Sequence, residues 1–196
     1  MAALRFSFSG NGASEGKFVD STISKEVEDL GSVLDRLKDY EICYVGHSMG
    51  GAVGVIRASR DERICYLISL AGMVHTKAFA QREFGMVKPG EGSMWDEPAC
   101  PLSQAYLDDM DRIGSVVELA SKIHVPWLLV HGTADDVVPP QDSLDILARA
   151  NESKELVQIQ GAKHGVSVEF TAPMTEKVTA WLKKLGNKTH RSSTRQ

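Results

Sequence analysis

The stretch "CYVGHSMGGAVGV", residues 43–55, joins a strand pattern to a helix pattern across a single serine. Its first residues form an apolar run typical of a strand, and its last residues are small ones typical of a closely packed helix. At the join, Gly46–Gly50 fits the pattern G-x-S-x-G with Ser48 at its centre. In a strand–turn–helix, this pattern holds the serine hydroxyl out on a strained turn, where flanking side chains would collide. The stretch therefore predicts a nucleophilic serine above a sheet edge, the alternative being a tight turn that happens to contain serine.

Strand and helix patterns alternate outward from this stretch. Apolar runs predict strands at 3–8, 41–46, 64–72, 125–132 and 154–161, and helical spacing predicts helices at 22–38, 50–59, 140–150 and 173–186. The run at 41–46 is continuous, which indicates burial on both faces of the sheet. Ser21 or Thr22 is placed to cap the first helix, and Gly186 to end the last one. The alternation predicts an α/β fold, with a mostly parallel sheet covered by helices on both faces.

One segment, residues 75–123, interrupts this alternation. It contains three prolines, several glycines and short amphipathic pieces, so we expect a small cap inserted over the carboxyl edge of the sheet. A chain of 196 residues suits one domain. We therefore expect a single domain over 1–186, and a disordered tail over 187–196 because that stretch lacks apolar content.

Composition restricts the class of protein. The chain is 42% hydrophobic and 24% charged with a net charge of −4, which is ordinary for a globular protein and argues against nucleic acid or an anionic membrane as partner. The three cysteines have no metal-ligand spacing and are odd in number, which favours a reducing, cytoplasmic setting over a disulfide framework. No apolar stretch is long enough to be a membrane span.

A serine nucleophile needs a base and an acid that orients the base. Asp135 and Asp136 follow the predicted strand at 125–132, and His164 follows the strand at 154–161. Taken alone, Asp135 is equally a turn residue or a helix cap, and His164 equally a loop histidine. Together with Ser48 they give the chain order Ser–Asp–His at successive strand ends, which predicts a catalytic triad. The backbone N–H of Met49 would then be an oxyanion donor at the N-terminus of the helix.

Four segments carry a resemblance to a known family. "RFSFSGNGASEGKF", "VGHSMGG", "HGTADDVVP" and "GAKHG" are similar to motifs of α/β-hydrolases of the serine-hydrolase type, in the branch of cinnamoyl and feruloyl esterases and monoglyceride-lipase-like enzymes. The acid loop of that family reads H-G-x-x-D-x-x-V-P, which here is filled by His131, Gly132, Asp135, Val138 and Pro139. The resemblance implies Asp135 as the triad acid and Asp136 as its reserve. His131 itself, at a strand end, we interpret as structural.

The resemblance implies a carboxylic ester hydrolase that works through an acyl-enzyme, with a small-molecule ester as substrate and with no metal or cofactor. His47, in the turn, and Trp95, in the insertion, are the expected substrate contacts. The aromatic and methionine residues of the insertion either line a pocket for the substrate or simply pack the cap on the body: Phe79, Phe84, Met86, Met94, Trp95, Tyr106 and Met110.

One departure from the family is large. Its members have three further strands before the one that matches 3–8, and the loop after the third supplies a second oxyanion donor. In the strand order of that fold, the third strand lies between those matching 3–8 and 41–46. We therefore expect a gap with unpaired edges there, unless the strands close up or another chain fills it. We therefore expect a truncated hydrolase. The alternatives are a fragment or a non-catalytic binding protein, and a peptidase or C–C hydrolase that uses the same triad.

Overall fold

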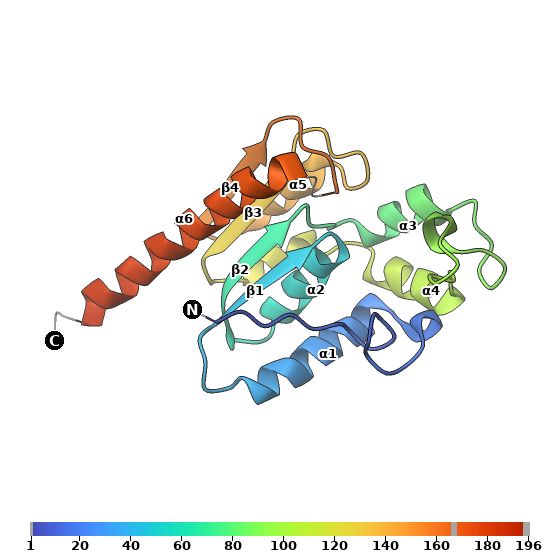
Figure 1. Ribbon diagram of the computed structural model, residues 1–196, viewed down its shortest axis with the longest axis horizontal. Helices are drawn as coiled ribbons and strands as arrows, with labels where there is room; N and C mark the ends of the chain where they lie inside the picture. Colours follow the sequence, from blue (N-terminus) through green and yellow to red (C-terminus); the bar gives the residue numbers. More distant parts are fainter. Residues whose placement is uncertain (1, 166–167, 194–196) are drawn as a thin grey trace.

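The computed structural model describes residues 2–165 and 168–193 (Figure 1). Four strands form one parallel sheet in the order in which they occur along the chain: β1 (Ile42–His47), β2 (Ile64–Leu70), β3 (Trp127–Gly132) and β4 (Lys154–Ile159). The strands predicted around residues 41–46, 64–72, 125–132 and 154–161 are thereby confirmed. Because all four run in the same direction, their carboxyl ends meet at one edge, where loops bring together residues distant in sequence.

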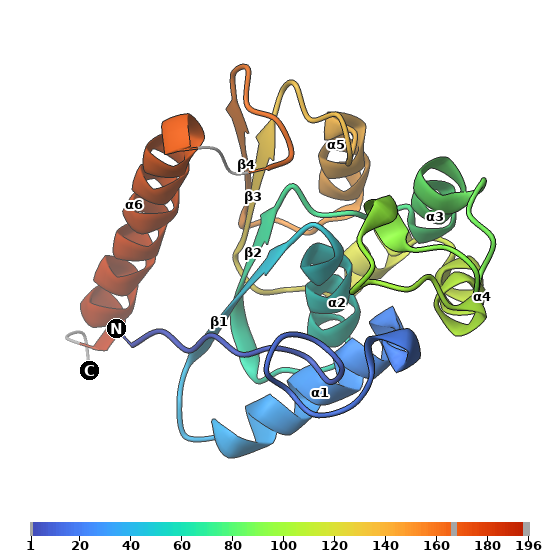
Figure 2. The ribbon, with the colours of Figure 1, turned by 45° about the vertical axis from the view of Figure 1, so that its right-hand side comes forward.

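Helices cover the two faces of the sheet unequally. The helices α1 (Ile23–Arg36), α2 (Met49–Ala58) and α5 (Pro140–Arg149) lie on one face, and α6 (Val168–Ser193) lies on the other (Figure 2). Alternate strand residues supply the two cores, since neighbouring side chains of a strand point to opposite faces. Leu67 and Leu129 join the larger core, whereas Ile68 and Leu128 pack with Trp181 of α6.

The first helix forms where its spacing predicted it. The Thr22 hydroxyl accepts a hydrogen bond from the Lys25 N–H at 3.1 Å, which satisfies one of the free donors at the helix start. Its apolar stripe is buried against the body: Ile23, Val27, Leu30 and Leu34. Burying a leucine or isoleucine side chain stabilises a fold by roughly 1.5–3 kcal/mol, so this stripe fixes α1 beside α2.

Short helices form the insertion at 75–123: α3 (Thr76–Phe84), η2 (Met94–Asp96), α4 (Gln104–Ile113) and η3 (Val117–Lys122), with η1 (Phe18–Asp20) preceding α1. The carboxylate of Asp109 on α4 accepts hydrogen bonds from the N–H and hydroxyl of Ser24 on α1, at 2.9 and 2.7 Å. Most of the aromatic and methionine side chains singled out here are buried in the main core: Phe79, Phe84, Met94, Tyr106 and Met110. They pack the insertion onto the body, whereas Met86 is fully exposed.

The strand predicted at 3–8 does not form, and this prediction was wrong. Residues 2–8 run past β1 without pairing with it (Figure 2), and Leu4 is 64% exposed. An apolar run becomes a strand only where it shares ladder hydrogen bonds with a neighbour, and residues 2–8 share none with the described strands. The burial predicted for β1 on both faces was wrong too, since α6 packs on β3 and β4 and leaves Val45 47% exposed.

The last helix is longer than its sequence indicated. α6 continues past Gly186, where we expected it to end, as far as Ser193. Glycine inside a helix costs only about 1 kcal/mol relative to alanine, so a glycine without other stop signals does not by itself end a helix. The tail expected over 187–196 overlaps this helix up to residue 193, and residues 194–196 lie outside the described residues. Within the described ranges, no helix is both long and apolar enough to cross a bilayer.

Candidate active site

Ser48 is the single residue between β1 and α2, and its backbone is strained. Its φ of 53° and ψ of −118° lie in a region that residues with a side chain rarely adopt. Backbone hydrogen bonds hold it there: its N–H donates to the Leu70 carbonyl at 3.0 Å, and its own carbonyl accepts from Gly51 and Met73 at 2.9 and 3.0 Å. The sharp turn predicted from G-x-S-x-G is thus formed by the ends of β1 and β2 together.

The glycines around Ser48 are not equivalent. A Cβ on Gly46 would lie 2.2 Å from the Gly50 carbonyl oxygen, and one on Gly51 would lie 2.6 Å from the Gly72 Cα, so neither position accepts a side chain. A Cβ on Gly50 meets only the Tyr44 hydroxyl, at an ordinary 3.5 Å. The expectation that both flanks of Ser48 must lack a side chain therefore holds for Gly46 and is wrong for Gly50.

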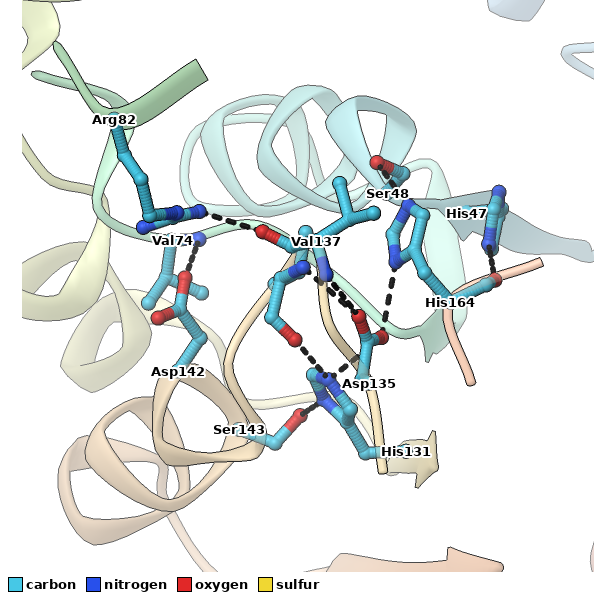
Figure 3. A network of polar contacts seen from close by, with 11 residues as sticks. His47, Ser48, Val74, Arg82, His131, Asp135, Val137, Asp142, Ser143 and His164 are labelled. Atoms are coloured by element: carbon cyan, nitrogen blue, oxygen red, sulfur yellow. Dashed lines mark hydrogen bonds and ion pairs between the residues drawn. The ribbon is translucent and has the colours of Figure 1, made fainter. Parts of the chain in front are cut away.

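Three side chains from three loops meet at the carboxyl edge of the sheet (Figure 3). The Ser48 Oγ lies 2.9 Å from His164 Nε2, and His164 Nδ1 lies 2.9 Å from Asp135 Oδ2. Asp135 follows β3, and His164 follows β4. Because Nδ1 faces a carboxylate, it carries the proton, which leaves Nε2 free to accept the serine proton. Asp136 instead points to solvent and pairs with Lys163 at 3.1 Å, so it does not contact His164.

Asp135 receives N–H donors from several directions. Its Oδ1 accepts hydrogen bonds from the Val137 and Val138 N–H groups at 3.0 and 2.9 Å, and its Oδ2 faces both His164 and His131. Burial alone would raise the pKa of this carboxyl, but the hydrogen bonds from His131 and His164, with those from the backbone, hold the pKa below its usual value. Asp135 is therefore a carboxylate when it meets His164.

His131, at the end of β3, belongs to this network. Its Nε2 lies 3.0 Å from the Val138 carbonyl and 3.2 Å from Asp135 Oδ2, and its Nδ1 lies 2.6 Å from the Ser143 hydroxyl. Sequence reasoning interpreted His131 as structural and did not connect it with the acid. The signal was present in the spacing, because His131 and Asp135 stand four residues apart across the turn that follows the strand.

The N-terminus of α2 points its first N–H groups toward the region of Ser48. Met49 is the first residue of that helix, so its N–H has no carbonyl partner one turn earlier within the helix. Such a group, with the positive end of the helix dipole, suits a negative charge that develops on an oxygen beside Ser48. The cap contacts the same residue, since the Tyr106 hydroxyl lies 3.7 Å from the Met49 Sδ.

The two expected substrate contacts lie in different places. His47 stacks beside His164 with ring centroids 4.9 Å apart, and its Nε2 donates to the His164 carbonyl at 3.2 Å. Burial and, next, the neighbouring His164 lower the pKa of His47. Trp95 is 58% exposed and packs its ring against Phe84 in the cap, so its contact with substrate stays a prediction.

A small cavity adjoins His164 at the ends of β2, β3 and β4, next to α6. Its walls are mostly apolar: His47, Leu70, Ala71, Val130, Gly132, Ile159, Ala162, Lys163, His164 and Met174. Because Met174 of α6 is among its walls, the cavity lies on the α6 side of the sheet edge. The cap lies on the other side, with α1 and α2 (Figure 2). The candidate site therefore has a small, mostly apolar cavity next to His164.

Comparison with known proteins places this geometry in context. The model of the prolyl oligopeptidase family matches residues 25–189. The human palmitoyl-protein thioesterase ABHD10, mitochondrial, is 28% identical over 159 residues, which are 76% of this chain and 52% of that protein. The uncharacterized protein Rv2307c of Mycobacterium tuberculosis is 27% identical over 168 residues, 84% of this chain and 53% of that protein. The chain spans about half the length of the curated relatives it matches.

Solved structures of esterases and lipases share the fold. Est1E from Butyrivibrio proteoclasticus, solved with ferulic acid bound, superposes with a TM-score of 0.80 at 26% identity, over 90% of this chain and 74% of that one. The monoacylglycerol lipase of Paleococcus ferrophilus gives a TM-score of 0.69 at 21% identity, over 88% and 79%. Est1E and the monoacylglycerol lipase thus share the arrangement of strands and helices over most of this chain.

Proposed function

Because the chain belongs to the prolyl oligopeptidase family and has the α/β-hydrolase fold, we propose that it is a serine hydrolase that cleaves acyl esters or thioesters. One observation carries the proposal: the unbroken hydrogen-bonded line from Ser48 through His164 to Asp135, with Ser48 on a strained turn. Strain of this kind persists only where the surroundings enforce it, and it is concentrated at functional sites.

The first half of the proposed reaction forms an acyl-enzyme. The Ser48 Oγ attacks the acyl carbon while its proton passes to His164 Nε2, and Asp135 stabilises the imidazolium that results. The carbonyl oxygen becomes an oxyanion, which the Met49 N–H at the start of α2 is placed to receive. The intermediate then collapses, the bond to the alcohol or thiol breaks, and His164 returns the proton to that leaving group.

The second half releases the acid. Water attacks the acyl carbon of the Ser48 ester, and His164 Nε2 takes a proton from it. The bond between the acyl carbon and Ser48 Oγ then breaks, and the proton returns to Ser48. All proton transfers run through His164, so neither a metal nor a cofactor is required for this sequence of steps.

The substrate class follows from the relatives as a proposal. The human relative is named a palmitoyl-protein thioesterase, and Est1E was solved with ferulic acid, so both names concern acyl groups. The mostly apolar cavity beside His164 suits an acyl or aryl group better than a charged one. The family name also keeps a peptidase open as a second candidate.

A substrate panel tests the proposal. The purified chain would be offered p-nitrophenyl esters of increasing acyl length, acyl thioesters and proline-containing peptide amides, with Ser48→Ala as the matched control. We expect turnover of esters or thioesters that disappears in Ser48→Ala. Turnover of the peptides alone would favour the peptidase. Binding of acyl ligands without any turnover, equal in both proteins, would contradict the proposal and identify a non-catalytic binding protein.

A further inference from the structure

We infer that His131 is a positioning residue of the candidate site, which holds the Asp135 carboxylate in the orientation that His164 requires. The inference rests on the proposed function, because positioning matters only if His164 acts as a base. It concerns a residue outside the Ser48–His164–Asp135 line, and it assigns His131 a task in the reaction rather than in packing alone.

The proton on His131 is fixed by its neighbours. Its Nε2 faces only acceptors, the Val138 carbonyl at 3.0 Å and Asp135 Oδ2 at 3.2 Å, so this nitrogen must carry the hydrogen. Its Nδ1 faces the Ser143 hydroxyl at 2.6 Å, which can donate a hydrogen bond to it. In this tautomer the His131 Nε2–H points to the Val138 carbonyl in the loop after β3 and to Asp135 Oδ2. The same carboxylate oxygen faces His164 Nδ1.

The ring itself has little freedom to move. The His131 and Asp135 side chains are both buried, and Ser143 is buried on α5 directly below the acid loop (Figure 3). Asp135 is thereby held on both oxygens, by the backbone N–H groups of the loop on Oδ1 and by His131 and His164 on Oδ2. A carboxylate restrained in this way cannot rotate away from His164, and misplacement by 1 Å can cost about 10²-fold in rate.

His131 also affects the strength of the hydrogen bond between Asp135 and His164. The His131 and His164 N–H groups converge on Asp135 Oδ2, so without the His131 N–H this oxygen is held less firmly toward His164 Nδ1. The other titratable groups near His164 are His47 from the end of β1, and the exposed pair of Lys163 with Asp136. Loss of the His131 N–H therefore weakens the Asp135–His164 hydrogen bond, and the protonated form of His164 is then less stabilised by Asp135.

Variants of His131 separate this task from packing. His131→Leu fills similar space without a donor, whereas His131→Gln keeps an N–H at about the same reach. Ser143→Ala removes the partner of Nδ1 and leaves the ring. Leu128→Ala is the stability control, because this residue is buried on the same strand but belongs to the core on the α6 face, away from the acid.

Two measurements read the effect. The first is the rate at which a fluorophosphonate probe labels Ser48 as a function of pH, and the second is the far-downfield proton resonance of His164 Nδ1–H. For His131→Leu we expect a loss of roughly 10-fold in the plateau rate, and an acidic limb moved down by roughly 0.5–1 pH unit. The resonance should move upfield, because the hydrogen bond from His164 Nδ1–H to Asp135 is weaker. His131→Gln should restore both, Ser143→Ala should show a smaller shift of the same sign, and Leu128→Ala should lower stability alone.

The outcomes distinguish this inference from the function on which it rests. An unlabelled Ser48 in the wild type would contradict the proposed hydrolase, while the Nδ1–H resonance would still report whether His131 acts on the Asp135–His164 bond. A labelled wild type with the same acidic limb and resonance in His131→Leu, or in Ser143→Ala should His131→Leu not fold, would overturn the inference. So would a His131→Gln that loses as much as His131→Leu.

Discussion

Two buried carboxyl groups in different regions of the molecule meet opposite surroundings. Asp135, after β3, is 9% exposed, and Glu26, on α1, is 3% exposed. Asp135 accepts hydrogen bonds from the backbone and from His164, and its pKa is held below the usual range. Glu26 makes no side-chain hydrogen bond or ion pair with the described part of the chain, and burial, with a smaller contribution from Asp29, raises its pKa to about 8.

The comparison shows that burial does not decide the charge of a carboxyl in this fold. Removing a carboxylate from water is costly, and N–H donors offset that cost only where the backbone and side chains present them. The acid loop presents them, because its turn directs two N–H groups inward and His131 and His164 approach from neighbouring strands. Near Glu26 lie Tyr44 of β1 and Tyr106 of α4, whose pKa values are raised by burial and then by Glu26. Their hydroxyls donate elsewhere, to the Gly50 carbonyl and to the Met49 Sδ.

The largest effect should come from removing the charge of Asp135. Asp135→Asn keeps the shape but cannot stabilise a protonated His164, so we expect fluorophosphonate labelling of Ser48 to slow by about 10³–10⁴-fold. The matched control is Asp136→Asn, the adjacent and exposed carboxyl, which should label at nearly the wild-type rate. Equal losses in the two variants would contradict the assignment of Asp135 as the acid.

The free energy of unfolding should depend on pH through Glu26. Between the unfolded value of 4.5 and the folded value of about 8, the unfolded chain has lost this proton while the folded protein retains it. The free energy of unfolding therefore falls as pH rises through that window, and the contribution is fully favourable only below pH 4.5. We expect Glu26→Gln to stabilise the protein by on the order of 3 kcal/mol at pH 8, and hardly at all at pH 4.5.

Urea unfolding at several pH values measures this difference. Glu28→Gln is the control, because Glu28 lies on the same helix but is exposed. A Glu26→Gln variant whose gain does not grow between pH 5 and pH 8 would show that Glu26 is charged in the folded protein. The contrast with Asp135 would then fail.

A smaller effect is expected at Asp142, which tests how much a hydrogen bond from a backbone N–H to a buried carboxyl stabilises the fold. It is buried at the start of α5 and accepts a hydrogen bond from the Val74 N–H at 2.9 Å, at the base of the cap. Asp142→Ala leaves that N–H without its partner, and we expect a loss of roughly 1–3 kcal/mol in the free energy of unfolding. Asp142→Asn keeps an acceptor oxygen and should cost clearly less. Equal losses would mean that the negative charge, not the hydrogen bond, is what matters there.

The smallest effect should be at the exposed carboxyl of Asp136. Its pKa is lowered, chiefly by a hydrogen bond from Lys163, but both side chains lie in solvent. Water and salt screen such a pair, so Lys163→Ala should leave the melting temperature unchanged within error. A measurable drop in melting temperature at low salt that vanishes at high salt would show that the pair contributes more than its exposure indicates.

Much of this fold could be predicted from local patterns. Apolar runs and helical spacing were sufficient to predict the strands β1–β4 and the helices α1, α2 and α5. Each of these elements finds its pairing or packing partners within the described residues. The meeting of Ser48, Asp135 and His164 also follows, since parallel strands bring their carboxyl ends to one edge. Chain order at successive strand ends was therefore sufficient to select these three residues.

Other features depend on contacts that no local pattern contains. The apolar run at 3–8 has the composition of a strand but pairs with none of the described strands, and Val45 is exposed because α6 packs over β3 and β4 instead. The burial of Glu26 arises from side chains of other elements that pack against α1. Such contacts are set by packing in three dimensions, whereas sequence spacing alone only indicates which residues are near enough to take part.

The most direct test is to treat the purified 196-residue chain with a fluorophosphonate probe and locate the adduct by mass spectrometry, with Ser48→Ala as control. If the hydrogen-bonded line to Asp135 activates the serine, the probe will modify Ser48 in the wild type and nothing in the variant. A folded protein, verified by circular dichroism and size-exclusion chromatography, that shows no adduct on Ser48 would contradict the account.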